Sequence, residues 1–95
     1  MRMLVSVDLD TDKGNELLRN GTMGDVIQSI MATVRPEVAY FHERNGGRAI
    51  TLVVEADDNA SMVPLLQPFW MELDARVQAV PCMTAEDLGA GMSRL

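Results

Sequence analysis

Residues 40–54, YFHERNGGRAITLVV, decide the fold, because they place two strand-like segments on either side of a turn. The dipeptides Asn45-Gly46 and Gly46-Gly47 favour the positive φ angles that tight hairpin turns require. The segments EVAYFHE and AITLVVEA flank this turn. The stretch therefore predicts an antiparallel hairpin joined through residues 44–48.

Side chains alternate between the two faces of a strand. In the first predicted strand, one face carries Val38, Tyr40 and His42, and the other carries Ala39, Phe41 and Glu43. In the second predicted strand, one face carries Ile50, Leu52 and Val54, and the other carries Thr51, Val53 and Glu55. Both faces of the hairpin therefore hold apolar residues.

The segments before the hairpin predict a strand and a helix. MRMLVSVDLD, residues 1–10, alternates as a strand, and residues 11–21 indicate a short helical turn closed by Gly21. From residue 22 the apolar residues recur every three or four positions, which predicts a helix that ends before Pro36. Thr22 with Asp25 indicates a cap similar to a capping box at its start.

The segments after the hairpin repeat this order. DDNASMVPLLQPFWMELD predicts a second helix, capped by Asp58 or Ser61, with a kink or a break at Pro68. ARVQAVPC predicts a short fourth strand. The closing segment TAEDLGAGMSRL predicts a final helical turn or two, capped by Thr84.

The order strand, helix, strand, strand, helix, strand predicts an α+β ferredoxin-like fold over a single domain of residues 1–95, with a four-stranded antiparallel sheet. Helices cover one face of such a sheet. Because several strands are apolar on both faces, a monomer would expose an apolar surface. We therefore expect a homodimer in which two sheets pack against each other.

Charge and composition narrow the function classes. The net charge of −6 argues against binding to nucleic acid, which requires a basic surface. The N-terminal apolar run is too short for a signal sequence or a membrane span. Cys82 is the only cysteine, so no disulfide forms within the chain. We expect a complete cytoplasmic protein that does not bind membranes.

The chain resembles small uncharacterised bacterial proteins of the dimeric α/β-barrel superfamily of ferredoxin-like domains. The resemblance rests on MRMLV, GNELLRNGTMGDVI, PEVAYFHERNGGRAITLVVEADD and PCMTAEDL, and covers nearly the whole chain. Better-known members of the superfamily include muconolactone isomerases and antibiotic-biosynthesis monooxygenases. The resemblance implies a small apolar or aromatic ligand between sheet and helices and, in several members, no cofactor. It carries over no catalytic residue.

Metal sites receive little support from the sequence. Asp8, Asp10 and Asp12 resemble the start of a calcium loop, but Lys13 and Arg19 stand where that loop needs glycine and glutamate. One cysteine and one histidine are too few ligands for a zinc or iron site within one chain. We therefore predict no metal and no cofactor, with the aspartates ending a strand and capping the next segment.

His42 and Tyr40 are the candidate catalytic residues. They share one strand face, where they could supply a base that works near neutral pH and a hydrogen-bond donor. Alternatively, His42 is a solvated residue near an exposed hairpin. Phe69 and Trp70 are the candidate pocket-lining residues, although both suit a hydrophobic core better. Cys82 is more typical of an inert thiol than of a reactive one.

Two functions remain open from the sequence. The first is a homodimer that binds a small apolar or aromatic metabolite, or a protein partner, without catalysis. The second is a cofactor-independent isomerase, cyclase or monooxygenase acting on a small aromatic or polyketide-like substrate. In the first case, charges placed at Phe41 or Val53 should disrupt assembly. In the second, removal of His42 should abolish turnover.

Overall fold

The predicted hairpin forms at the centre of the chain, in a computed structural model that describes residues 1–95. Strands β2 (Val38–Arg44) and β3 (Gly47–Glu55) pair antiparallel. Asn45 and Gly46 form the loop between them, with φ angles of 54° and 82°. Two successive positive φ angles are typical of a type I′ turn, whose twist matches that of the strands.

The four strands form one antiparallel sheet in the order β2-β3-β1-β4. Strand β1 (Arg2–Asp8) lies between β3 and β4 (Arg76–Pro81). Helices α2 (Met23–Val34) and α3 (Met62–Leu73) are the two main helices that the sequence predicts. Two further helices, α1 (Thr11–Arg19) and α4 (Ala85–Met92), form where the sequence predicts only helical turns. The fold is α+β and ferredoxin-like.

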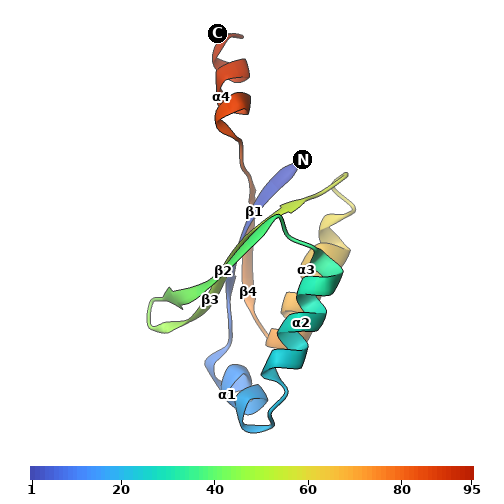
Figure 1. The fold of residues 1–95 in the computed structure, drawn as a ribbon, viewed down its shortest axis with the longest axis vertical. Helices are drawn as coiled ribbons and strands as arrows, with labels where there is room; N and C mark the ends of the chain where they lie inside the picture. Colours follow the sequence, from blue (N-terminus) through green and yellow to red (C-terminus); the bar gives the residue numbers. More distant parts are fainter.

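The hydrophobic core lies between the sheet and helices α2 and α3, which run side by side over one sheet face (Figure 1). Alternation directs every second residue of the central strands into this layer. Its sheet side is formed by Met3, Val5, Val7, Ile50, Leu52 and Val54. Phe69, with no exposed surface, is the largest fully buried side chain.

Local signals set most of the helix ends as predicted. Gly21, at φ 70°, ends α1 in a Schellman motif, in which Thr22 N–H donates to Leu17 O and Gly21 N–H donates to Leu18 O. The predicted cap of α2 is wrong, because the Thr22 hydroxyl donates to Leu17 O and makes no capping bond to α2. Helix α2 ends at Val34, before Pro36, as predicted.

Helix α3 begins after Ser61 and continues through Pro68, so the predicted alternative of a break at Pro68 is wrong. Asp58 organises the entry, because its Oδ1 accepts from the Ser61 hydroxyl at 2.7 Å and from Ser61 N–H at 2.8 Å. These hydrogen bonds lower the pKa of Asp58 below its ordinary value. Phe69 and Leu73, both buried beyond Pro68, pack this second half of α3 against the sheet.

The sheet face away from α2 and α3 carries an apolar row across all four strands. Register places Val80, Leu4, Val53 and Val38 side by side in this row. The next row along the strands is polar and holds Gln78, Ser6, Thr51 and Tyr40. We call this surface the open face, because no helix of the chain covers it (Figure 1).

Helix α4 projects beyond the sheet, away from the other helices (Figure 1). None of its residues is buried, and Leu88 and Met92 are 50% and 58% exposed. A compact chain of this length has a radius of gyration of about 12 Å, whereas this chain has one of 15.0 Å. The extended shape therefore comes from a helix that packs on nothing in its own chain.

The start of α4 carries the cap that the sequence predicts. Thr84 N–H donates to Asp87 Oδ2 at 3.0 Å, and Asp87 N–H donates to the Thr84 hydroxyl at 3.1 Å. This reciprocal pair is a capping box. The hydrogen bond from Thr84 N–H contributes most to lowering the pKa of Asp87, and the hydrogen bond with the Thr84 side chain lowers it further.

This capping box should make α4 sensitive to acid. A carboxyl group whose pKa is lowered by folding stabilises the folded form above its unfolded pKa of about 3.9. That contribution is lost as the pH falls through the lower folded value. We expect the NMR amide signals of α4 to move toward random-coil positions below about pH 4, before those of β1 change. In the control Asp87→Asn, the α4 signals should not move toward random-coil positions over this range. Wild-type α4 signals that are unchanged at pH 2 would contradict a role for ionised Asp87.

Candidate ligand-binding site

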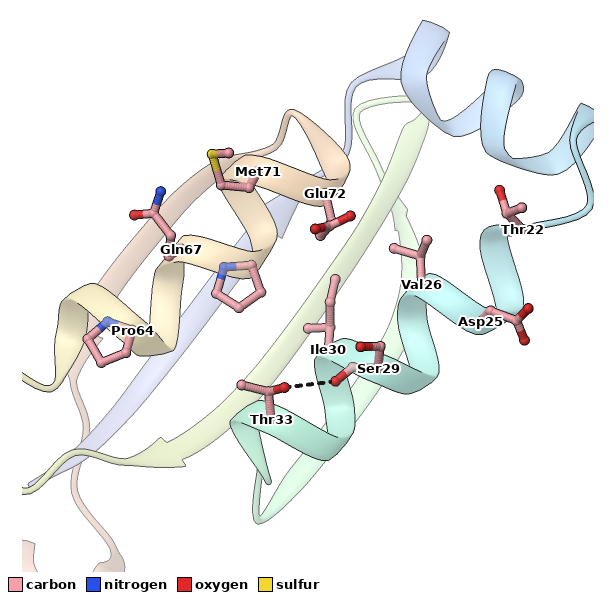
Figure 2. A pocket seen from close by; sticks show the side chains of 11 residues that line it. Thr22, Asp25, Val26, Ser29, Ile30, Thr33, Pro64, Gln67, Met71 and Glu72 are labelled. Atoms are coloured by element: carbon pink, nitrogen blue, oxygen red, sulfur yellow. Dashed lines mark hydrogen bonds between the residues drawn. The ribbon is translucent and has the colours of Figure 1, made fainter.

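A groove of about 670 Å³ runs between α2 and α3 on the outer side of the helix layer (Figure 2). Val26 and Ile30 contribute apolar surface from α2, while Pro64, Gln67 and Met71 lie across the gap on α3. Val26, Ile30, Met71 and two prolines make most of its lining surface apolar, and acidic and hydroxyl side chains border it. Ligand pockets are predominantly apolar with a few polar groups, so this groove is a further candidate site for a small ligand.

The charge of the α2–α3 groove is negative. Asp25 and Glu72 line it, and no lysine, arginine or histidine does. The Thr33 hydroxyl donates to Ser29 O at 3.1 Å within α2, so this group already has a partner inside the chain (Figure 2). The groove should therefore repel anionic ligands.

A second hollow, of about 300 Å³, lies between α1, α2 and the β2–β3 hairpin. We call it the hairpin hollow; seven of its nine lining residues are hydrophobic. It is lined by Leu9, Leu18, Met23, Ile27, Phe41, His42, Arg48, Ala49 and Ile50. Its composition is that expected of a small apolar site.

The sheet pattern explains why the hairpin hollow exists. Phe41 pairs with Ile50 and shares its face of the sheet, the face that the helices cover. However, β2 is the edge strand, so Phe41 stays 56% exposed, and Leu18 of α1 is also half exposed. Two large apolar side chains thus border a space that the chain itself leaves unfilled.

Arg48 is the cationic group of the hairpin hollow. Its Nη2 donates to Asn15 Oδ1 at 2.9 Å, which links β3 to α1. Gly14 makes room for it, because a Cβ at Gly14 would stand 2.7 Å from Arg48 Nη1. Arg48 also lines an adjoining polar hollow of about 430 Å³ that includes Thr11 and Asn15. The guanidinium therefore lies between an apolar space and a polar one.

No carboxylate of the chain forms an ion pair with Arg48. Glu43 is its cross-strand neighbour, but the Glu43 carboxylate accepts from Gly46 N–H at 2.8 Å in the turn. The ion pairs between side chains are Arg2 with Glu37 and Arg44 with Asp8. Arg48 is thus a half-buried cation whose only side-chain partner is a neutral amide.

His42 and Tyr40 lie on the open face, as their shared parity predicts. His42 Nδ1 is 2.8 Å from Glu43 O, and Nε2 is 2.7 Å from the Thr51 hydroxyl. A carbonyl oxygen only accepts, so in the neutral ring Nδ1 carries the proton and Nε2 accepts from Thr51. His42 forms part of the rim of the hairpin hollow, but its ring nitrogens bond elsewhere. A catalytic role for His42 and Tyr40 stays a prediction.

Phe69 and Trp70 do not line the α2–α3 groove or either hollow at the hairpin. Phe69 is in the core, and Trp70 is 42% exposed on the surface of α3.

Sequence reasoning missed Arg48 and Asn15. The available signal was the glycine inside the first helix, Gly14, which indicates a close approach.

The remaining sequence candidates serve local structure. Asp10 accepts from Lys13 N–H at 3.0 Å and caps α1, as predicted. Asp8 pairs with Arg44 at 2.9 Å. Cys82 is half-buried and extends the pairing of β4, with its N–H donating to Arg2 O. No three histidine, cysteine or acidic side chains are grouped as metal ligands, and no helix is long and apolar enough to cross a membrane.

Three solved structures are similar to this chain. An uncharacterised protein from Thermotoga maritima is 17% identical, with a TM-score of 0.52 over 86% of this chain and 95% of that one. A protein from Agrobacterium tumefaciens is 8% identical, with a TM-score of 0.46 over 90% and 96%. A proposed antibiotic biosynthesis monooxygenase from Deinococcus radiodurans is 11% identical, with a TM-score of 0.44 over 90% and 95%. No family model matches the sequence, nor does any curated protein. At such identities the likeness shows the fold alone.

Proposed function

We propose that this ferredoxin-like chain is a homodimeric binding protein that takes up a small apolar metabolite without transforming it. The observation that carries the proposal is the hairpin hollow, a mostly apolar space whose lining contains no carboxylate. Its volume of about 300 Å³ is at the lower end of the range for small-molecule sites. The ligand is therefore small.

The open face supports the dimer. Leu4, Val53, Val38 and Val80 form a continuous apolar row, and Val38 and Val80 are exposed in the single chain. Contiguous exposed apolar surface on a small domain marks an interaction site. A second copy is the simplest cover, because two open faces related by a two-fold axis present the same row to each other.

Helix α4 also supports a second copy. Isolated helices shorter than about 12–15 residues are marginal in water, and α4 has eight residues, two of them glycines. Its exposed Leu88 and Met92 find no surface within the chain. A partner beside the open face would give these side chains something to pack against.

Native mass spectrometry on freshly purified protein tests the proposal directly. We expect twice the chain mass, with additional mass from a retained small molecule. A dimer without additional mass would favour the alternative, in which the homodimer binds a protein partner instead of a small molecule. A monomer at micromolar concentration would contradict the pairing of the open faces.

One observation favours catalysis as the second candidate. The 2.7 Å contact of His42 Nε2 with the Thr51 hydroxyl resembles the pairing of a base with a nucleophile or proton relay. A cofactor-independent isomerase, cyclase or monooxygenase would use His42 and Tyr40 on a small aromatic or polyketide-like substrate. In that case the substrate would lie against the open face.

Replacement of His42 by alanine separates the two functions. For a binding protein, His42→Ala should leave the melting temperature unchanged and the dissociation constant of the retained ligand within about twofold. The reason is that the imidazole is exposed at the rim of the hairpin hollow, and its ring nitrogens bond to Glu43 O and to the Thr51 hydroxyl. Calorimetry with the ligand identified by mass spectrometry measures this. Conversion of that ligand by the wild type, lost in His42→Ala but kept in the control Gln78→Ala, would establish the enzyme.

A further inference from the structure

We infer that the hairpin hollow binds small apolar carboxylic acids, with the carboxylate held by Arg48 and the apolar body between α1, α2 and β2. This inference rests on the proposed function and adds the chemical class of the ligand. It concerns the helix-covered side of the sheet, where His42 contributes only to the rim of the hollow and Tyr40 does not line it.

The charge at Arg48 points to an anion. The chain carries a net charge of −6, yet this guanidinium has no carboxylate within ion-pairing distance. Its cross-strand neighbour Glu43 bonds to the turn instead. An anion offsets the cost of withdrawing a cation from water, so a cation left without one at the mouth of a hollow is suited to an anionic ligand.

The shape of the group points to a carboxylate. A guanidinium has five N–H donors in a rigid plane, which fit the two oxygens of a carboxylate. Asn15 accepts from Nη2, and this contact orients the plane without neutralising it. Donors on Nε and Nη1 remain for a ligand at the boundary of the two hollows.

The surrounding side chains define the rest of the ligand. Leu18, Ile27 and Phe41 enclose an apolar space from three different elements. A short aromatic or branched chain fills such a space and excludes water from the ion pair, which strengthens the electrostatic attraction. The α2–α3 groove cannot serve the same ligand, because Asp25 and Glu72 repel an anion there.

Gly14 positions Arg48 for this role. A methyl group at position 14 would approach Nη1 to 2.7 Å and displace the guanidinium from α1. Because that atom is the end of a flexible side chain, the protein can fold around the change. Alanine is also a better helix former than glycine. Gly14→Ala should therefore weaken binding of the acid without loss of stability.

Paired NMR titrations test the inference with 3-phenylpropionate and its neutral analogue 3-phenylpropan-1-ol on the ¹⁵N-labelled full chain. We expect the acid to shift the amide signals of Phe41, Arg48 and Ile27, and to bind at least ten times more tightly than the alcohol. Arg48→Gln and Gly14→Ala should each weaken the acid at least tenfold and leave the alcohol unchanged. Arg94→Gln removes the same charge from the exposed C-terminal end and should have no effect.

The outcomes separate the inference from the proposed function. If acid and alcohol bind the hairpin hollow equally and Arg48→Gln changes neither, the carboxylate inference is wrong and an apolar binding site remains. If neither compound shifts a signal of the hollow, both the inference and the proposed function are overturned. Shifts confined to α2 and α3 at their groove would also overturn the inference.

Discussion

Replacement of Phe69 by alanine should lower the free energy of unfolding by about 3–5 kcal/mol, the usual cost of deleting a buried aromatic side chain. Phe69 has no exposed surface and packs in the cluster that joins α3 to the sheet. Small domains have only about 5–15 kcal/mol of stability in total. Denaturant unfolding followed by circular dichroism should therefore show a much lower midpoint for Phe69→Ala.

The neighbouring tryptophan provides the control for Phe69. Trp70→Ala removes a larger side chain from the next position of α3, but that side chain is 42% exposed. We expect its cost to be less than half that of Phe69→Ala. Equal losses for the two variants would contradict the separation of core and surface along α3. A Phe69→Ala variant with normal stability but weaker ligand binding would restore the sequence-based hypothesis of a pocket wall.

A charge at the centre of the open face should abolish the proposed dimer. Val53 lies in the apolar row, between Leu4 on β1 and Val38 on β2. In a two-fold assembly, Val53→Asp buries two unpaired carboxylates, each at a cost of about 2–5 kcal/mol. We therefore expect the dissociation constant to rise at least 100-fold, measured by analytical ultracentrifugation over a concentration series.

A matched substitution on the helix layer controls for the effect of charge alone. Val63 is 62% exposed on α3, far from the open face, so Val63→Asp should leave the dimer intact. Equal dissociation of both variants, or a Val53→Asp dimer as tight as the wild type, would contradict the sheet-to-sheet interface. A charge at Phe41 tests a different site, since Phe41 lies on the helix-covered side and borders the hairpin hollow.

Features set by neighbouring residues were predictable from the sequence. The Asn45-Gly46 turn, the Gly21 helix end, the caps at Asp10 and Thr84, and the stop before Pro36 all formed as predicted. Each depends on the conformational freedom or hydrogen bonding of a residue within its own turn. The exception was Thr22, whose hydroxyl bonds backward to Leu17 instead of forward into α2.

Two features depended on interactions between distant segments. Pro68 removes a helix hydrogen bond, yet α3 continues without a break, because Phe69 and Leu73 pack into the core beyond it. The sequence favoured Phe69 as a core residue over a pocket wall, and its complete burial places it in the core. At Pro68 tertiary packing outweighed a local signal.

The candidate site was the least predictable feature. The sequence drew attention to His42 because it is the only histidine, but its ring is bonded to Thr51 on the open face. Arg48 depends on Gly14 and Asn15, which the chain brings to it from another element. Neither Arg48 nor Asn15 belongs to a recognisable sequence motif.

The sequence by itself determined the order of the main elements, most of their turns and caps, and the two-sided apolar pattern of the sheet. These features depend on periodicity and on hydrogen bonds that act within a few residues. Only the tertiary structure decided which face the helices cover, where a hollow remains beside Phe41, and that Arg48 lacks a carboxylate partner. These features arise from side chains far apart in the sequence, whose packing and charges act on one another only after the chain has folded.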